Sequence, residues 1–223
     1  MQNNLEIDSV MMSYGELKIL TDIYLKCQTG DIIGIMGRNG CGKSTLLKII
    51  FGSINNPNKS IRINGKKYDQ PFKVPGLVGY LPQHHFLLPH LNIYETIRLY
   101  LDADAVNPFL TDTVIGHLQK SKINSLSGGE MRYLEIKLML HARNQFVLLD
   151  EPFNGVAPIA VEQLKIMITE HSKTKGIILT DHDYNNVLDV ANRYCLIHEG
   201  SMKPIEGRED LIKWSYLTEN SLA

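Results

Sequence analysis

The chemistry of this chain is clearest in a glycine-rich segment that ends in a lysine and two hydroxyl residues. Residues 37–45 read Gly-Arg-Asn-Gly-Cys-Gly-Lys-Ser-Thr and match the pattern G-x-x-x-x-G-K-[ST]. In this pattern the backbone N–H groups of a loop converge on phosphate oxygens, and the start of the next helix favours an anion. We therefore expect the segment to bind the phosphates of a nucleoside triphosphate. The residues concerned are Gly37, Arg38, Asn39, Gly40, Cys41, Gly42, Lys43, Ser44 and Thr45.

Three side chains of this segment have distinct predicted roles. We expect Lys43 to reach the β- and γ-phosphates, Ser44 to bind Mg²⁺ through its hydroxyl, and Thr45 to hydrogen-bond near the α-phosphate. The apolar residues 31–36 before the loop indicate a buried strand, and residues 43–51 have helical spacing. This order of strand, loop and helix favours a phosphate loop over a chance glycine-rich turn.

A second element is an apolar strand that ends in two acids. Residues 146–149 are apolar, and Asp150 and Glu151 follow. At the carboxyl edge of a sheet Asp150 can hold Mg²⁺ through a water, and Glu151 can orient or deprotonate the attacking water. Such a pair alone often only solvates a strand end. Together with Ser44, however, it describes hydrolysis of the triphosphate rather than binding alone.

A second candidate anion site lies at the start of a later helix. Residues 126–130 read Leu-Ser-Gly-Gly-Glu, a capping box with glycines at a helix N-terminus. A chain with one triphosphate does not need two phosphate sites, so we expect this one to contact the nucleotide of another copy. The residues concerned are Ser127, Gly128, Gly129 and Glu130.

With these elements in this order, nearly the whole chain resembles the ATP-binding cassette (ABC) family. Residues 37–44 match the family's phosphate loop, residues 126–130 its signature motif, and residues 146–151 its Walker B strand and catalytic glutamate. The resemblance implies ATP and Mg²⁺ as the bound cofactors. It also implies that the chain pairs with a second copy of itself or with a paralogous cassette.

Three more residues match single-residue motifs of the family. Tyr14 matches the aromatic residue that stacks on adenine, Gln83 the glutamine near Mg²⁺, and His182 the histidine that contacts the γ-phosphate. Each has an ordinary alternative: a strand-end aromatic, a polar loop residue and a core histidine. The resemblance implies that the catalytic residues are Glu151, His182 and Lys43, and that the residues around the metal are Ser44, Gln83 and Asp150.

The resemblance and the hydrophobic pattern together predict an α/β fold. We expect a P-loop NTPase core with a mostly parallel sheet and flanking helices, an N-terminal antiparallel β subdomain, and a short helical subdomain. One domain would cover residues 1–223, with the core in 1–83 and 145–223 and the helical subdomain in about 84–144. The expected strands are two or three within 5–28, then 60–68, 78–81, 145–150, 177–180 and 194–198. The expected helices are 43–51, 93–100, one within 102–124, one from 127, then 158–170, 183–191 and 209–217.

Composition limits the partners of the chain. Its 223 residues have a formal net charge of −1, so no global basic field favours nucleic acid. The three cysteines are far apart, which fits a reducing cytoplasm rather than a disulfide framework. We find neither an apolar signal segment nor a run of about 20 apolar residues. These features favour a cytoplasmic protein, and the resemblance implies that it is peripheral on the inner face of the membrane through a permease.

The resemblance implies the ATP-hydrolysing subunit of a transporter, which drives a separate integral-membrane permease. One alternative is a soluble cassette ATPase without a permease, like the iron–sulfur assembly member of the family. Another is a regulatory nucleotide-binding module that does not turn over.

The sequence also departs from the family pattern. Ala157 stands where the D-loop of the family has an aspartate, which predicts weaker communication between two sites. Residues 83–127 form a shorter segment than is usual for transporter cassettes, which suggests a small or unusual partner. Residues 152–214 look like the lipopolysaccharide-export and branched-chain amino acid types, particularly at Glu-Pro-Phe-x-Gly-Val and Thr-Asp-His.

Overall fold

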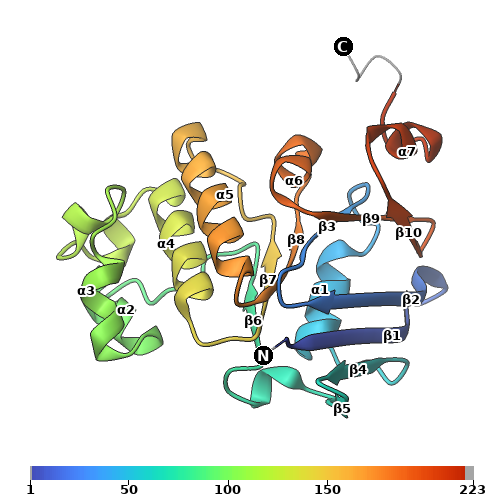
Figure 1. The fold of residues 1–223 in the computed structure, drawn as a ribbon, viewed down its shortest axis with the longest axis horizontal. Helices are drawn as coiled ribbons and strands as arrows, with labels where there is room; N and C mark the ends of the chain where they lie inside the picture. Colours follow the sequence, from blue (N-terminus) through green and yellow to red (C-terminus); the bar gives the residue numbers. More distant parts are fainter. Residues whose placement is uncertain (1, 219–223) are drawn as a thin grey trace.

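Two β-sheets form the framework of residues 2–218, the part of the chain that this computed structural model describes (Figure 1). The larger sheet has six strands in the order β10-β9-β3-β8-β7-β6, and the smaller has four in the order β2-β1-β4-β5. The strands are β1 (Asn4–Tyr14), β2 (Leu17–Gln28), β3 (Ile32–Met36), β4 (Ser60–Ile63), β5 (Lys66–Lys67), β6 (Val78–Leu81), β7 (Phe146–Asp150), β8 (Gly176–Thr180), β9 (Arg193–His198) and β10 (Ser201–Ile205). The α-helices are α1 (Lys43–Phe51), α2 (Ile93–Tyr100), α3 (Ala103–Phe109), α4 (Gly128–His141), α5 (Pro158–Ser172), α6 (Tyr184–Val190) and α7 (Arg208–Lys213). Short 3₁₀ turns occupy Pro71–Lys73, Gly116–Leu118 and Ile123–Ser125.

The larger sheet is parallel except for its edge strand β10, which pairs antiparallel with β9. Its central strands are continuous apolar runs because packed elements cover both faces. On β3, Ile33 and Ile35 pack with α1 and the smaller sheet, whereas Ile32 and Met36 pack with α4, α5 and α6. The carboxyl ends of β3, β7 and β8 therefore lie together at one edge, where ligands bind in open parallel sheets.

The smaller sheet is antiparallel and packs against α1. β1 pairs with β2 on one side and β4 on the other. The β4–β5 hairpin turns at Asn64 and Gly65, whose φ angles of 51° and 80° suit the Asn-Gly turn that the sequence predicts. Figure 1 shows this sheet beside α1, and the apolar side chains of α1 join the core that the two sheets share.

The helices α2 and α3 lie at the far end of the molecule from the smaller sheet, and α4 lies between them and α5 (Figure 1). Capping boxes open two of these helices, as the sequence predicts. The Asn92 side chain accepts from the Glu95 backbone N–H at the start of α2, and the Ser127 side chain accepts from that of Glu130 at the start of α4. The division into a core and a helical subdomain at about residues 84–144 stays a prediction.

The predicted α/β class is confirmed, and the predicted strands and helices lie close to the observed ones. One expected boundary was wrong, and one strand was not predicted. The C-terminal helix ends at Lys213 rather than at residue 217, because Ser215 adopts a left-handed φ of 55°. The strand β10 was not predicted, and it contains Pro204, a residue that is uncommon within strands. Within residues 2–218, no helix combines the length and apolar character that crossing a membrane requires.

Candidate nucleotide-binding site

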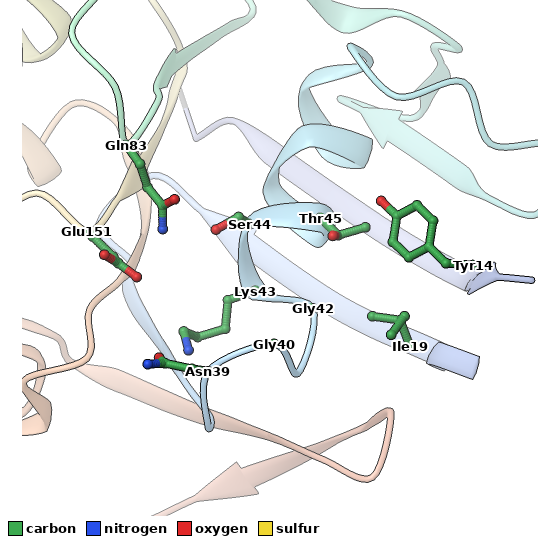
Figure 2. A pocket seen from close by; sticks show the side chains of 10 residues that line it. All are labelled: Tyr14, Ile19, Asn39, Gly40, Gly42, Lys43, Ser44, Thr45, Gln83 and Glu151. Atoms are coloured by element: carbon green, nitrogen blue, oxygen red, sulfur yellow. The ribbon is translucent and has the colours of Figure 1, made fainter. Parts of the chain in front are cut away.

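A hollow of about 480 Å³ lies at the carboxyl edge of the larger sheet, within the size range of ligand pockets (Figure 2). The loop between β3 and α1 forms its floor. Its lining residues are Tyr14, Ile19, Asn39, Gly40, Gly42, Lys43, Ser44, Thr45, Gln83 and Glu151. Predicted residues from four separate segments of the sequence thus meet in one place.

The loop needs its glycines because of its backbone and its neighbours. Gly40 and Gly42 have φ angles of 80° and 106°, which L side chains rarely adopt. A Cβ at Gly42 would lie 2.7 Å from the Ile19 side chain and 2.9 Å from that of Leu20. No side chain caps the N-terminus of α1, so its first N–H groups face the hollow as donors for an anion.

Lys43 lies along this loop with its ammonium beside Asn39 (Figure 2). Lys43 is only 6 % exposed, and its Nζ donates to the carbonyl oxygens of Gly37 at 2.6 Å and Arg38 at 3.3 Å. The loop backbone thus holds a positive charge at the place where phosphates are expected. Coulomb attraction is stronger at such a partly desolvated position than in bulk water.

Asp150 accepts three hydroxyl hydrogen bonds at the end of β7. Its Oδ1 accepts from Ser44 Oγ at 2.9 Å and from Thr180 Oγ1 at 3.0 Å, and its Oδ2 accepts from Tyr80 OH at 3.0 Å. Burial, followed by the charge of Asp150, raises the pKa of Tyr80, so this phenol stays a donor. The Ser44 and Asp150 oxygens are hard ligands that lie together, and the Gln83 side chain lines the same hollow. This donor set, with one carboxylate, fits Mg²⁺, which is usually bound by one or two carboxylates together with phosphate and water oxygens.

Glu151 follows Asp150 and lines the hollow with its carboxylate (Figure 2). Its φ is 51°, and the Thr180 carbonyl accepts from its backbone N–H at 3.0 Å. A non-glycine residue in this region is strained, and such strain gathers at functional sites. The His182 Nδ1 lies 3.9 Å from Glu151 Oε2, and the His182 side chain is 54 % exposed, which does not suit a packed core histidine.

Tyr14 ends β1 at the opposite side of the hollow from Gln83 and Glu151 (Figure 2). The residue is 54 % exposed, and its ring faces the hollow near Thr45. An exposed ring in this position can stack on a base.

Several predicted residues lie outside this hollow. The Arg38 guanidinium donates to the Ser215 carbonyl at 2.9 Å, and Gly37 and Cys41 do not line it either. Burial raises the pKa of the Cys41 thiol. His182 lines a neighbouring hollow with Asp181 and Asn154.

The signature residues do not line this hollow either. Ser127 and Glu130 form the capping box at the start of α4, and the Ser127 hydroxyl donates to Glu130 Oε2 at 2.8 Å. Gly128 lines a smaller hollow of about 230 Å³, which shares Gln83 and Glu151 with the first.

Sequence reasoning missed three residues that organise the site. Tyr80 and Thr180 hold Asp150, and Arg132 donates to the backbone carbonyls of Asp150 and Glu151 at 2.6 and 3.0 Å. Thr180 could have been found, because it ends the strand before His182. Nothing in the sequence pattern singles out Tyr80 or Arg132.

The fold and this loop define a P-loop nucleotide-binding protein. The model of the family described as ABC transporter matches residues 20–154. The chain is 30 % identical over 212 residues to the lipopolysaccharide export system ATP-binding protein LptB of Haemophilus influenzae, with 89 % of this chain and 88 % of that protein covered. It is 32 % identical over 209 residues to LptB of Escherichia coli K12, with 85 % of each covered.

Two solved structures share the fold. An ATP-binding subunit of an ABC transporter superposes with a TM-score of 0.81 at 24 % identity, covering 96 % of this chain and 94 % of that one. A dimeric bacterial ABC transporter cassette has a TM-score of 0.76 at 20 % identity, covering 91 % and 99 %. The chain belongs to the ABC transporter family, as an ATP-binding subunit.

Proposed function

We propose that this chain binds and hydrolyses ATP with Mg²⁺, and that two copies close around two nucleotides to drive a separate membrane permease. The observation that supports this function best is the single hollow that joins Lys43, Ser44 and Glu151. It combines a cation that can bind phosphates, a metal ligand and a carboxylate base, which are the groups that phosphoryl transfer to water needs.

Each side chain has a role that its position supports. Lys43 holds the β- and γ-phosphates, and the ring of Tyr14 supports the adenine. Ser44, Gln83 and Asp150 would hold Mg²⁺, which neutralises charge on the phosphates when bound. Glu151 accepts a proton from the attacking water or orients it, and His182 donates to the γ-phosphate from beside Glu151.

The dimer accounts for the signature residues of α4. Ser127 and Gly128 do not line the nucleotide hollow of their own chain, and the N-terminus of α4 can accept an anion. In a head-to-tail pair, each nucleotide lies between Lys43 of one copy and Ser127 of the other. Among similar folds is a bacterial cassette that is dimeric, which supports this arrangement.

The permease and the location are inferred from the relatives. LptB is named as the ATP-binding protein of a lipopolysaccharide export system, and the chain matches it over most of its length. A partner with membrane spans would place this chain at the inner face of the membrane. Recovery of an integral membrane protein with the tagged chain would support the transporter over the soluble cassette ATPase.

Phosphate release from the purified chain tests the catalytic part of the proposal. We expect ATP-dependent release that the Lys43→Ala change abolishes, because the bound phosphates lose their buried cation. Lys48→Ala is the matched control, since Lys48 is an exposed lysine near the other end of the same helix. ATP binding without release by the unmodified chain would contradict hydrolysis and favour the regulatory module.

A further inference from the structure

Two buried charged residues, Arg132 and Glu135, lie one turn apart on α4, just after the signature motif. The residue Arg132 is 3 % exposed, and Glu135 is fully buried. The Arg132 Nη1 lies 3.6 Å from Glu135 Oε2. Burying an ion pair costs desolvation free energy unless further hydrogen bonds satisfy both groups. The other hydrogen-bond partners of Arg132 and Glu135 therefore indicate the structural role of the pair.

The guanidinium of Arg132 joins the ends of two neighbouring strands. Its Nη1 donates to the Pro82 carbonyl at 2.6 Å, directly after β6 and before Gln83. Its Nη2 donates to the carbonyls of Asp150 and Glu151 at 2.6 and 3.0 Å, at the end of β7. One planar cation thus fixes the two backbone segments from which Gln83 and Glu151 enter the hollow.

The carboxylate of Glu135 holds the same loop after Gln83. Its Oε1 accepts from the Phe86 backbone N–H at 2.9 Å, and its Oε2 lies 3.0 Å from His85 Nδ1. The loop that contains Gln83 is therefore tied to α4 at both ends, by Arg132 before the glutamine and by Glu135 after it.

We propose that Arg132 and Glu135 are positioning residues for ATP hydrolysis, which keep Gln83 and Glu151 in fixed register with each other and with the signature motif at the start of α4. This inference rests on the proposed function. Neither side chain needs to touch the nucleotide. The fork of an arginine suits the task, because a lysine at this position cannot reach three carbonyls with planar, pre-organised donors.

Arg132→Lys and Glu135→Gln test the proposal, and Lys137→Met is the matched control. Lys137 is a similarly buried cation on α4 at 5 % exposure, but it donates to the Phe109 carbonyl at 2.6 Å and lies 3.0 Å from Asp112. Those partners belong to the segment around α3, so the control removes a buried α4 cation without altering the carbonyls of Pro82 and Glu151.

The first readout is amide hydrogen exchange of the nucleotide-free chain, which is independent of turnover. We expect faster exchange across residues 83–88 in Arg132→Lys and Glu135→Gln, and no change there in Lys137→Met. Equal exchange of this segment in all three variants and the unmodified chain would overturn the proposed tie between α4 and the loop.

The second readout separates ATP binding from turnover. We expect Arg132→Lys to lower kcat by about 10- to 100-fold, because small displacements of a catalytic group have effects of this size. The Kd for ATP should stay within about twofold, since Lys43 and Tyr14 are untouched. Lys137→Met should lower the unfolding temperature and leave kcat close to that of the unmodified chain.

A kcat for Arg132→Lys equal to that of Lys137→Met would overturn the positioning role, even if the exchange result held. The failure of the proposed function looks different. In that case the unmodified chain itself releases no phosphate, while the exchange experiment still decides whether the tie exists.

Discussion

The Ser44 hydroxyl donates to Asp150 Oδ1 at 2.9 Å, although 106 residues separate them in the chain. Ser44 belongs to the first turn of α1, and Asp150 ends β7. This contact brings the expected metal ligand that follows the phosphate loop beside the one that ends β7, two strands away from β3 in the sheet. The two predicted metal ligands are therefore in direct contact, although Asp150 is buried and only Ser44 lines the hollow.

Removal of the Tyr14 ring should weaken nucleotide binding. We expect Tyr14→Ala to raise the Kd for ATP by an amount equivalent to about 1–2 kcal/mol, which is typical of a base stacked on an aromatic side chain. Calorimetric titration measures this change. Tyr24→Ala is the control, because Tyr24 is also about half exposed, at 50 %, but does not line the hollow. Equal affinity of the two variants would rule out stacking on Tyr14.

The two signature glycines should respond differently to alanine. A Cβ at Gly128 would meet no atom within 4 Å, whereas a Cβ at Gly129 would lie 2.9 Å from the Gly155 carbonyl. We expect Gly129→Ala to destabilise the chain, and Gly128→Ala to leave its unfolding temperature unchanged or raise it, since alanine favours helix.

The stable Gly128→Ala variant then isolates the effect of a partner. If the phosphates of a second copy approach Gly128, the added methyl should lower ATP turnover by about an order of magnitude or more. Steady-state phosphate release measures this loss. Unchanged turnover in a well-folded Gly128→Ala protein would mean that no nucleotide contacts the signature motif.

Ala157 leaves the start of α5 without a side-chain cap. It is the N-cap residue, with φ −64° and ψ 142°, and makes no capping hydrogen bond. We expect Ala157→Asp to raise the free energy of unfolding by about 0.5–2 kcal/mol, through a cap and a favourable charge at the helix N-terminus. Urea unfolding measures the gain. Ala157→Asn separates the effect of the cap from that of the charge. A loss of stability in both variants would contradict the claim that a capping side chain stabilises the start of α5.

Acid should destabilise the protein through a histidine pair between α4 and α5. Burial, followed by the charge of His141, lowers the pKa of His171 from 6.5 to about 4, and burial also lowers that of His141. The unfolded chain thus binds more protons between pH 6.5 and 4, so stability is full above pH 6.5 and falls as the pH drops through this window.

The His171→Phe variant tests this linkage. From pH 7 to pH 5 we expect the unmodified protein to lose on the order of 1–2 kcal/mol more unfolding free energy than this variant, which keeps a ring but cannot take a proton. Urea unfolding at both pH values measures the difference. Identical losses in the two proteins would contradict the assigned role of His171.

Local sequence patterns were sufficient for the elements that carry the nucleotide site. The apolar runs of β3 and β7 and the glycine loop before α1 each contain their own signal, because a buried parallel strand and a phosphate loop are defined within a few residues. In the structure, Tyr14, Gln83 and Glu151 line the same hollow as this loop.

The remaining features depend on neighbours that are distant in sequence. Tyr80 reaches Asp150 because β6 and β7 pair in parallel with Tyr80 opposite Leu148, and only the strand order reveals that. β10 tolerates Pro204 because it is an edge strand with a single paired neighbour. The contacts of Arg132 depend on how α4 crosses the sheet, which no local pattern specifies.

The central claim is that two copies of the chain share each nucleotide, with Lys43 of one and Ser127 of the other on opposite sides. Light scattering of Glu151→Gln with ATP and Mg²⁺ tests it most directly, because this change should keep binding and remove the base that ends the ATP-bound state. Glu162→Gln is the control, since Glu162 lies on the exposed face of α5. We expect the Glu151→Gln protein to have twice the monomer mass with ATP and the monomer mass without it. A Glu151→Gln protein that binds ATP and stays monomeric at every concentration would contradict the shared site.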